Sequence, residues 1–209
     1  RAARRGLFLV CSAGNEGPAL TTVGAPATVP HALAVAAAVW PDTQRSNYSS
    51  FAPAPLVLFD FSSRGPLPTG DLGVDFAAPG AALSSLPSWT LTRGENFNGT
   101  SMASPQMAAC VALLRCAAQA ENLPQEWERL YRALRLSAEP IPGFTPLDYG
   151  HGAIRMEGAL AALRLLATVP DAARAYAVVV ENQFGAGAGV YERRAADGLA
   201  FDRAIRVAP

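Results

Sequence analysis

Ala32 to Val39 is an unbroken apolar run between Pro30 and Pro41. A run this long and this apolar fits a strand buried on both faces, because a half-exposed strand would alternate apolar and polar residues. Two shorter runs repeat the pattern, Leu7 to Ser12 and Val74 to Ala77, each followed by turn-forming residues. Strands covered on both faces are typical of parallel sheets, so the sequence predicts an α/β fold.

Three helices are expected after these strands. Ser101 to Ala118 is apolar almost all round, which predicts a helix buried inside the domain rather than on its surface. A second helix begins near Pro124 and is amphipathic, with apolar residues at i, i+3, i+4 and i+7: Trp127, Leu130, Tyr131 and Leu134. Arg155 to Thr168 predicts a third helix, stopped by Pro170.

The composition changes after Pro170. Ala175 to Val180 is strand-like, Gly185 to Gly189 predicts a glycine-rich turn, and Val190-Tyr191 begins another extended piece. We therefore expect residues 1–170 to form one α/β unit, and residues 171–209 to be a β-rich segment that begins a following domain.

Charge and hydropathy exclude several kinds of partner. The chain has 17 Lys plus Arg and 17 Asp plus Glu, so no net field attracts nucleic acid or anionic lipid. Its apolar runs are shorter than the roughly 20 residues that cross a bilayer. We expect a soluble protein with no nucleic-acid or membrane partner. The acidic residues Asp42, Asp60, Asp71 and Asp75 do not cluster, so we expect no metal site.

The cysteines and the N-terminus point to the cellular setting. Cys11, Cys110 and Cys116 lie in apolar contexts without a CxxC pair, so we expect buried, free thiols and a reducing compartment. The first residues include neither an initiator Met nor the apolar core of a signal peptide. The sequence therefore looks like the middle of a longer, cytoplasmic polypeptide.

The strongest chemical signal is the segment Asn98 to Pro105, in which a glycine turn places Ser101 at the mouth of a helix. Free N–H groups at a helix N-terminus stabilise negative charge, so a serine there can act as a nucleophile beside its own oxyanion donor. The simpler interpretation is that Ser101 caps the helix. Spacing alone does not separate the two.

The second signal is Asn15, between Gly14 and Gly17 in a loop directly after a strand. Ligands of α/β sheets bind at this carboxyl edge, where a side-chain amide could act as a second oxyanion donor. An asparagine between glycines is also an ordinary turn residue.

Taken together, four motifs in this order and spacing resemble the subtilisin-like serine peptidase family: Gly14-Asn15-Glu16-Gly17, Ser62-Ser63-Arg64-Gly65-Pro66, Ala78-Pro79-Gly80 and Gly99-Thr100-Ser101-Met102-Ala103-Ser104-Pro105. The resemblance implies a three-layer fold with a partial parallel sheet and no cofactor. It also implies Ser101 as nucleophile, Asn15 in the oxyanion hole and Thr100 as a support for that hole.

Three further runs are similar to the tripeptidyl-peptidase branch of that family: Ser12 to Pro26, Pro87 to Leu91 and Gly150-His151-Gly152. That resemblance implies peptide substrates, release of tripeptides from free N-termini, a cytoplasmic location and a homo-oligomeric full-length protein. Endopeptidase action stays open at this stage.

A serine nucleophile needs a general base and an acid that orients it. The chain has His31, at the start of a strand, and His151, in a glycine turn, and neither has the context that the family uses for its base. We therefore expect an Asp and a His from an N-terminal part of the same polypeptide, and little activity from these residues alone. The alternative is a non-catalytic scaffold or assembly fragment, or a degenerate pseudopeptidase.

Two remaining features have structural interpretations. Arg64 is expected to anchor a loop rather than to bind substrate. Asn47 and Asn98 match the glycosylation pattern by chance, because modification at Asn98 would block the nucleophile.

Overall fold

The computed structural model describes residues 6–83, 86–87, 89–91, 94–169, 177–182, 185–187 and 205–208. Its main sheet is built around β2 (Ala32–Val39), with β1 (Leu9–Ser12) and β4 (Phe76–Pro79) parallel to it. Val35 pairs with both Ser12 and Phe76, so β1 and β4 flank β2 on opposite sides. All of β2 is buried, which confirms the prediction from its apolar run.

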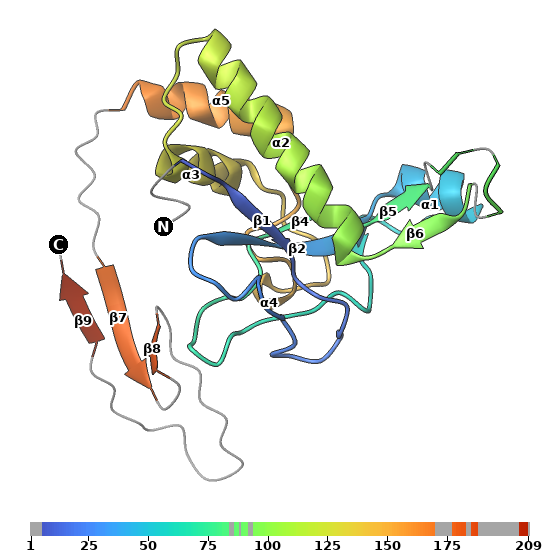
Figure 1. Ribbon diagram of the computed structural model, residues 1–209, viewed down its shortest axis with the longest axis horizontal. Helices are drawn as coiled ribbons and strands as arrows, with labels where there is room; N and C mark the ends of the chain where they lie inside the picture. Colours follow the sequence, from blue (N-terminus) through green and yellow to red (C-terminus); the bar gives the residue numbers. More distant parts are fainter. Residues whose placement is uncertain are drawn as a thin grey trace.

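One face of the sheet is covered by helices (Figure 1). α2 (Thr100–Ala120) contacts β1, β2 and β4, and α3 (Trp127–Ser137) and α5 (Met156–Ala167) complete this side. The buried side chains between sheet and helices include Leu33 and Val35 of β2, Met107 and Leu114 of α2, and Leu163 of α5. The predicted helices therefore form close to the predicted positions.

The other face of the sheet packs on loops and on the short helix α4 (Pro146–Tyr149). Ala36, Ala38 and Ala77 point into a second core that also contains Ile141 and Tyr149. The result is the expected α/β arrangement, with the sheet between a helical layer and a layer of loops. Among the described residues, no helix combines the length and the apolarity that crossing a bilayer requires.

Several short elements were not expected from the sequence. α1 (Pro41–Tyr48) follows β2 directly, and β3 (Val57–Leu58) pairs antiparallel with the end of β2. β5 (Ala81–Leu83) and β6 (Asn96–Asn98) form an antiparallel pair that leads into α2. Proline at the first position of α1 suits a helix start, although in the sequence it marked only the end of a strand.

The prediction that α2 is buried all round is wrong for the described part of the chain. One stripe is buried, while Leu113 on the outer side is 62% exposed and Ala109 and Ala112 are exposed as well. Alanine is apolar but small, so it neither requires nor excludes burial. The apolar composition of an alanine-rich helix therefore overestimates the fraction of its surface that is buried. The expectation of buried cysteines is confirmed for Cys11 and wrong for Cys116, which is exposed, while Cys110 is half-buried.

The described C-terminal residues form a separate three-stranded sheet, in which β7 (Ala177–Asn182) pairs antiparallel with β8 (Gly185–Gly187) and β9 (Ile205–Ala208). Gly185 pairs with Asn182, so Gly185 to Gly187 is a strand and not the predicted turn. Glycine content alone does not distinguish a turn from a short strand that pairs with a neighbour. The proposed boundary near residue 170 and the extended piece at Val190-Tyr191 lie outside the described residues.

The structure confirms Arg64 as a loop anchor. Its guanidinium lies 3.1 Å from Asp148 Oδ1, and the two side chains are only 18% and 8% exposed. The other carboxylate oxygen of Asp148 accepts hydrogen bonds from the N–H (2.6 Å) and hydroxyl (2.8 Å) of Thr145, which caps α4. One carboxylate therefore joins the loop after β3 to α4.

Replacing Asp148 by asparagine is expected to lower the free energy of unfolding by about 3 kcal/mol, because it leaves the charge of Arg64 buried without a partner. Urea unfolding monitored by circular dichroism measures this loss. The control is Asp42→Asn, which breaks the exposed pair with Arg45 (96% and 59% exposed) and should cost under about 1 kcal/mol. Equal losses in the two variants would contradict the anchoring role.

Candidate active site

The loop after β1 and the N-terminus of α2 are joined through one side chain. Asn15 Oδ1 accepts hydrogen bonds from the N–H of Thr100 and from its hydroxyl, both at 3.0 Å. The same hydroxyl accepts the N–H of Gly14 at 3.2 Å. Thr100 is 1% exposed, so these bonds are shielded from water. The structure thus brings together all three residues that the resemblance singled out: Asn15, Thr100 and Ser101.

Two N–H donors border the same point in space at this junction. Because Asn15 Oδ1 is directed at Thr100, its amide nitrogen Nδ2 faces the other way. A Cβ placed on Gly99 would lie 3.6 Å from Asn15 Nδ2 and 3.6 Å from the backbone nitrogen of Ser101. The Ser101 N–H has no acceptor among the described residues, whereas those of Thr100 and Met102 bond to Asn15 and Gly99. A substrate oxygen that becomes negative there would meet both donors.

The side chain of Ser101 is free to react. The residue is exposed, at the second position of α2, and the N-cap position is taken by Gly99 without a side-chain cap. The interpretation of Ser101 as a helix cap is therefore wrong. The interpretation of Asn15 as a plain turn residue is also insufficient, since its side chain bonds to a residue 85 positions away.

The segment around Ser63 holds the Asn15 loop through hydrogen bonds to its neighbours Gly14 and Glu16. The Ser63 hydroxyl donates to the Glu16 carboxylate at 2.9 Å and accepts the Glu16 N–H at 3.1 Å. The Ser63 N–H also bonds to the carbonyl of Gly14 at 3.0 Å. Ser63 was predicted only as part of a motif, with no role of its own. The strand before it, β3, already ends at Leu58, so no local pattern marked this serine.

Neither histidine lies at this junction. His31 precedes β2 and is exposed, with φ 66°, whereas Asn15 follows β1. Leu9 is level with Ala32 and Ser12 with Val35, so His31 and Asn15 are separated by at least about 10 Å along the strands. His151 is bound at the start of β4, where its N–H donates to the carbonyl of Asp75 at 2.7 Å. The described residues therefore supply no imidazole base to Ser101.

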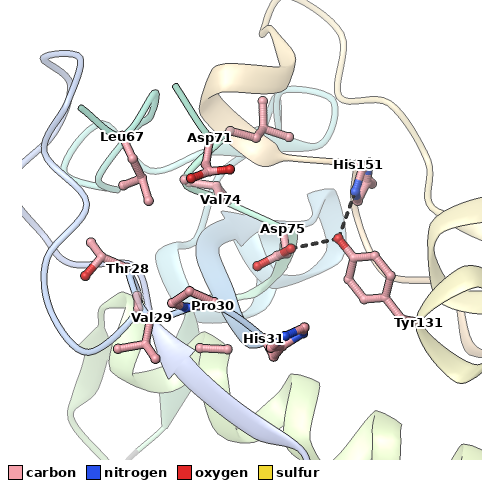
Figure 2. Close-up of a pocket in the computed structure, with 14 residues that line it drawn as sticks. Thr28, Val29, Pro30, His31, Leu67, Asp71, Val74, Asp75, Tyr131 and His151 are labelled. Atoms are coloured by element: carbon pink, nitrogen blue, oxygen red, sulfur yellow. Dashed lines mark hydrogen bonds between the residues drawn. The ribbon is translucent and has the colours of Figure 1, made fainter. Parts of the chain in front are cut away.

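His151 belongs instead to a hydrogen-bond chain beside a cavity of about 320 Å³ (Figure 2). The Tyr131 hydroxyl donates to Asp75 Oδ1 at 2.8 Å and lies 3.0 Å from His151 Nε2. Asp75 Oδ2 accepts the N–H of Ala34 at 2.8 Å. His151 was expected only to form a turn, and it also joins α3 to the edge of the sheet opposite Ser101.

Burial shifts the two ionisable ends of this chain in opposite directions. It lowers the pKa of His151, with the nearby Arg135 acting in the same sense, and it raises the pKa of Asp75. The fold thus favours neutral His151. Its contribution to the free energy of unfolding is fully present above the ordinary histidine pKa of about 6.5. It is lost as the pH falls from there through the lower pKa of the folded state. Neutral Asp75 contributes in the opposite sense, because its stabilisation is lost as the pH rises above about 4.

The contribution of His151 to the free energy of unfolding should therefore fall as the pH drops below about 6.5, and His151→Gln should remove that fall while the opposing contribution of Asp75 remains. The slope attributable to one proton is at most about 1.4 kcal/mol per pH unit. Urea unfolding at closely spaced pH values measures it. If His151→Gln keeps the wild-type slope, another group is responsible.

The fold and this junction define an α/β protein with a serine at the tip of a sheet-packed helix, facing an asparagine loop. Comparison with known proteins is consistent with that class. The model of the Subtilase family, Peptidase_S8, matches residues 1–187. The chain therefore belongs to the subtilase family.

Individual relatives cover most of the chain. It is 41% identical over 172 residues to tripeptidyl-peptidase 2 of Arabidopsis thaliana, which covers 80% of this chain and 12% of that protein. It is 32% identical over 206 residues to tripeptidyl-peptidase 2 of Drosophila melanogaster, covering 98% and 14%. Pyrolysin of Pyrococcus furiosus is 33% identical over 172 residues, covering 72% and 12%. The chain thus spans less than a sixth of the length of these relatives.

Solved structures share the fold. The prenylagaramide maturation protease PagA is 23% identical, with a TM-score of 0.55, and covers 77% of this chain and 52% of that one. The PatG macrocyclase in complex with peptide is 26% identical, with a TM-score of 0.54, covering 77% and 43%. The prediction of a subtilisin-like α/β fold is confirmed.

Proposed function

We propose that this chain supplies the nucleophile and the oxyanion hole of a serine peptidase. The observation that carries the proposal is the point beside Gly99 that both Asn15 Nδ2 and the Ser101 N–H border. Thr100 fixes this arrangement, since it holds the asparagine side chain against the helix N-terminus. Membership of the subtilase family supports the same assignment.

The chemistry follows from these positions. Ser101 Oγ attacks the carbonyl carbon of a peptide bond and gives its proton to an imidazole, while the carbonyl oxygen becomes an oxyanion between the two donors. Collapse of this intermediate breaks the C–N bond, and the imidazole returns the proton to the leaving amine. Water then hydrolyses the acyl-enzyme by the same route. Since no described histidine reaches Ser101, the His and its Asp come from another part of the same polypeptide.

We propose further that the substrates are peptides with a free N-terminus and that the products are tripeptides, on the likeness to two tripeptidyl-peptidases. The same resemblance supports a cytoplasmic homo-oligomer. Product analysis by mass spectrometry distinguishes the alternatives: tripeptides should appear from a free peptide and disappear when its N-terminus is acetylated. Internal cleavage of the acetylated peptide would make the protein an endopeptidase.

The nucleophile itself is tested by labelling the full-length protein with a fluorophosphonate and mapping the modified peptide. The adduct is expected on Ser101 alone. A folded protein that stays unlabelled, or that carries the adduct on another serine, would favour the non-catalytic alternative, a scaffold or a pseudopeptidase, which the lack of a nearby described histidine otherwise suggests.

A further inference from the structure

Two side-chain contacts tie α1 to β6, the strand that leads into the nucleophile turn (Figure 1). Asn96 Nδ2 donates to the carbonyl of Asn47 at 2.7 Å. The hydroxyl of Tyr48 donates to Asn98 Oδ1. Both contacts join residues about 50 positions apart, at the end of α1 and three to five residues before Ser101. α1 therefore acts directly on the segment that carries the serine.

Burial does not explain why α1 is there. None of its residues is buried, so the helix adds little to either core. A short, polar helix of this kind gains little stability by itself. Gln44 holds the following loop by hydrogen bonds to the backbone of Ala54, at 2.8 and 3.2 Å. Toward β6 the helix presents the Asn47 carbonyl and the Tyr48 hydroxyl.

The nucleophile turn is held at successive residues from different sides. The N–H of Gly99 donates to the carbonyl of Gly80 at 2.9 Å, and Thr100 is bound to Asn15. Asn98 is the residue before these two, and its side-chain oxygen is held by Tyr48. The contact with α1 thus completes a series of anchors at Asn98, Gly99 and Thr100, immediately before Ser101.

The Tyr48 hydroxyl is suited to be a lasting donor. Burial raises the pKa of Tyr48, although the hydrogen bond to Asn98 opposes this shift. The hydroxyl therefore keeps its proton at neutral pH.

We propose that Tyr48 is a positioning residue for Ser101, acting through Asn98. This inference rests on the proposed peptidase function. Small displacements of a nucleophile are costly, about 10²-fold in rate for 1 Å. Loss of the hydroxyl removes one contact of Asn98, which stays paired with Ala81 in the β5–β6 ladder, and leaves the anchors at Gly99 and Thr100. We therefore expect a smaller effect, roughly tenfold in the rate of acylation.

The test uses the full-length protein and a fluorophosphonate probe. Tyr48→Phe should label Ser101 about tenfold more slowly, while the final labelled fraction and the melting temperature stay at the wild-type values. An unchanged final fraction shows that the loss is in the rate and not in the amount of folded protein. With a peptide substrate, kcat should fall and KM should stay within about a factor of two.

The matched control is Tyr131→Phe, which also removes a hydrogen-bonded hydroxyl but at the opposite edge of the sheet. It should lower the melting temperature and leave the labelling rate unchanged. A double-mutant cycle isolates the contact: Tyr48→Phe combined with Asn98→Ala should be no slower than Asn98→Ala alone.

The outcomes separate the two proposals. If wild-type protein is labelled on Ser101 and Tyr48→Phe is labelled equally fast, or if the two substitutions multiply, the positioning role is wrong and the peptidase function stands. If wild-type protein is not labelled on Ser101, both fail.

Discussion

Replacing Ser101 by alanine in the full-length protein is expected to lower kcat by about 10⁶-fold, the loss found when the nucleophile is removed from subtilisin, a member of the same family. The substitution removes the only atom that the proposed mechanism uses to form the acyl-enzyme. Because Ser101 is exposed and does not cap α2, the free energy of unfolding should change by less than about 0.5 kcal/mol. Steady-state kinetics and urea unfolding measure the two effects.

A nearby serine provides the control. Ser104 lies one turn further along α2 and is only half-buried, so Ser104→Ala removes the same group from the same helix. It should keep its activity within a factor of about three. If Ser101→Ala retained peptidase activity, or if both variants lost it equally, Ser101 would not be the nucleophile.

Asn15→Ala is expected to lower kcat by about 10² to 10³-fold, which is the loss measured for the oxyanion-hole asparagine of subtilisin itself. Alanine removes both the free Nδ2 donor and the Oδ1 acceptor for Thr100. The variant alone therefore cannot separate loss of the oxyanion donor from loosening of the loop.

Asn15→Asp separates the two roles. Aspartate keeps an oxygen for the N–H and hydroxyl of Thr100 but offers no donor to a substrate, and its charge repels an oxyanion. It should therefore lose at least as much kcat as the alanine variant, while its melting temperature stays nearer that of the wild type. Wild-type activity in Asn15→Asp would show that the side chain has only a structural role.

The sequence was most informative where one residue type dictates one environment. The apolar run of β2 predicted a doubly covered strand with its ends correct to the residue, because no half-exposed strand tolerates such a run. The predicted ends of helix α2 were correct to within two residues. Its predicted burial was wrong, because neither its alanines nor Leu113 show by themselves whether another element covers them. α1 and the β5–β6 pair were missed because short polar elements lack hydrophobic periodicity.

The site could be predicted only in part. Order and spacing of motifs pointed to Asn15, Thr100 and Ser101, and the structure brings them together. Ser63 and Tyr48 were not given a role, because each acts through a hydrogen bond to a residue about 50 positions away. Such pairs depend on tertiary structure and leave no local pattern in one sequence.

The buried stripe of α2 limits how relatives of this chain can diverge. Thr100, Ala103 and Met107 lie on one side of the helix, against the sheet, and Ser101 is carried at the same end. A larger side chain at Ala103 would push the helix away from the strands and carry the serine with it. Substitutions at these positions are thus limited in two ways. They must fit the close-packed interior, and they must keep Ser101 at the same distance from the Asn15 loop.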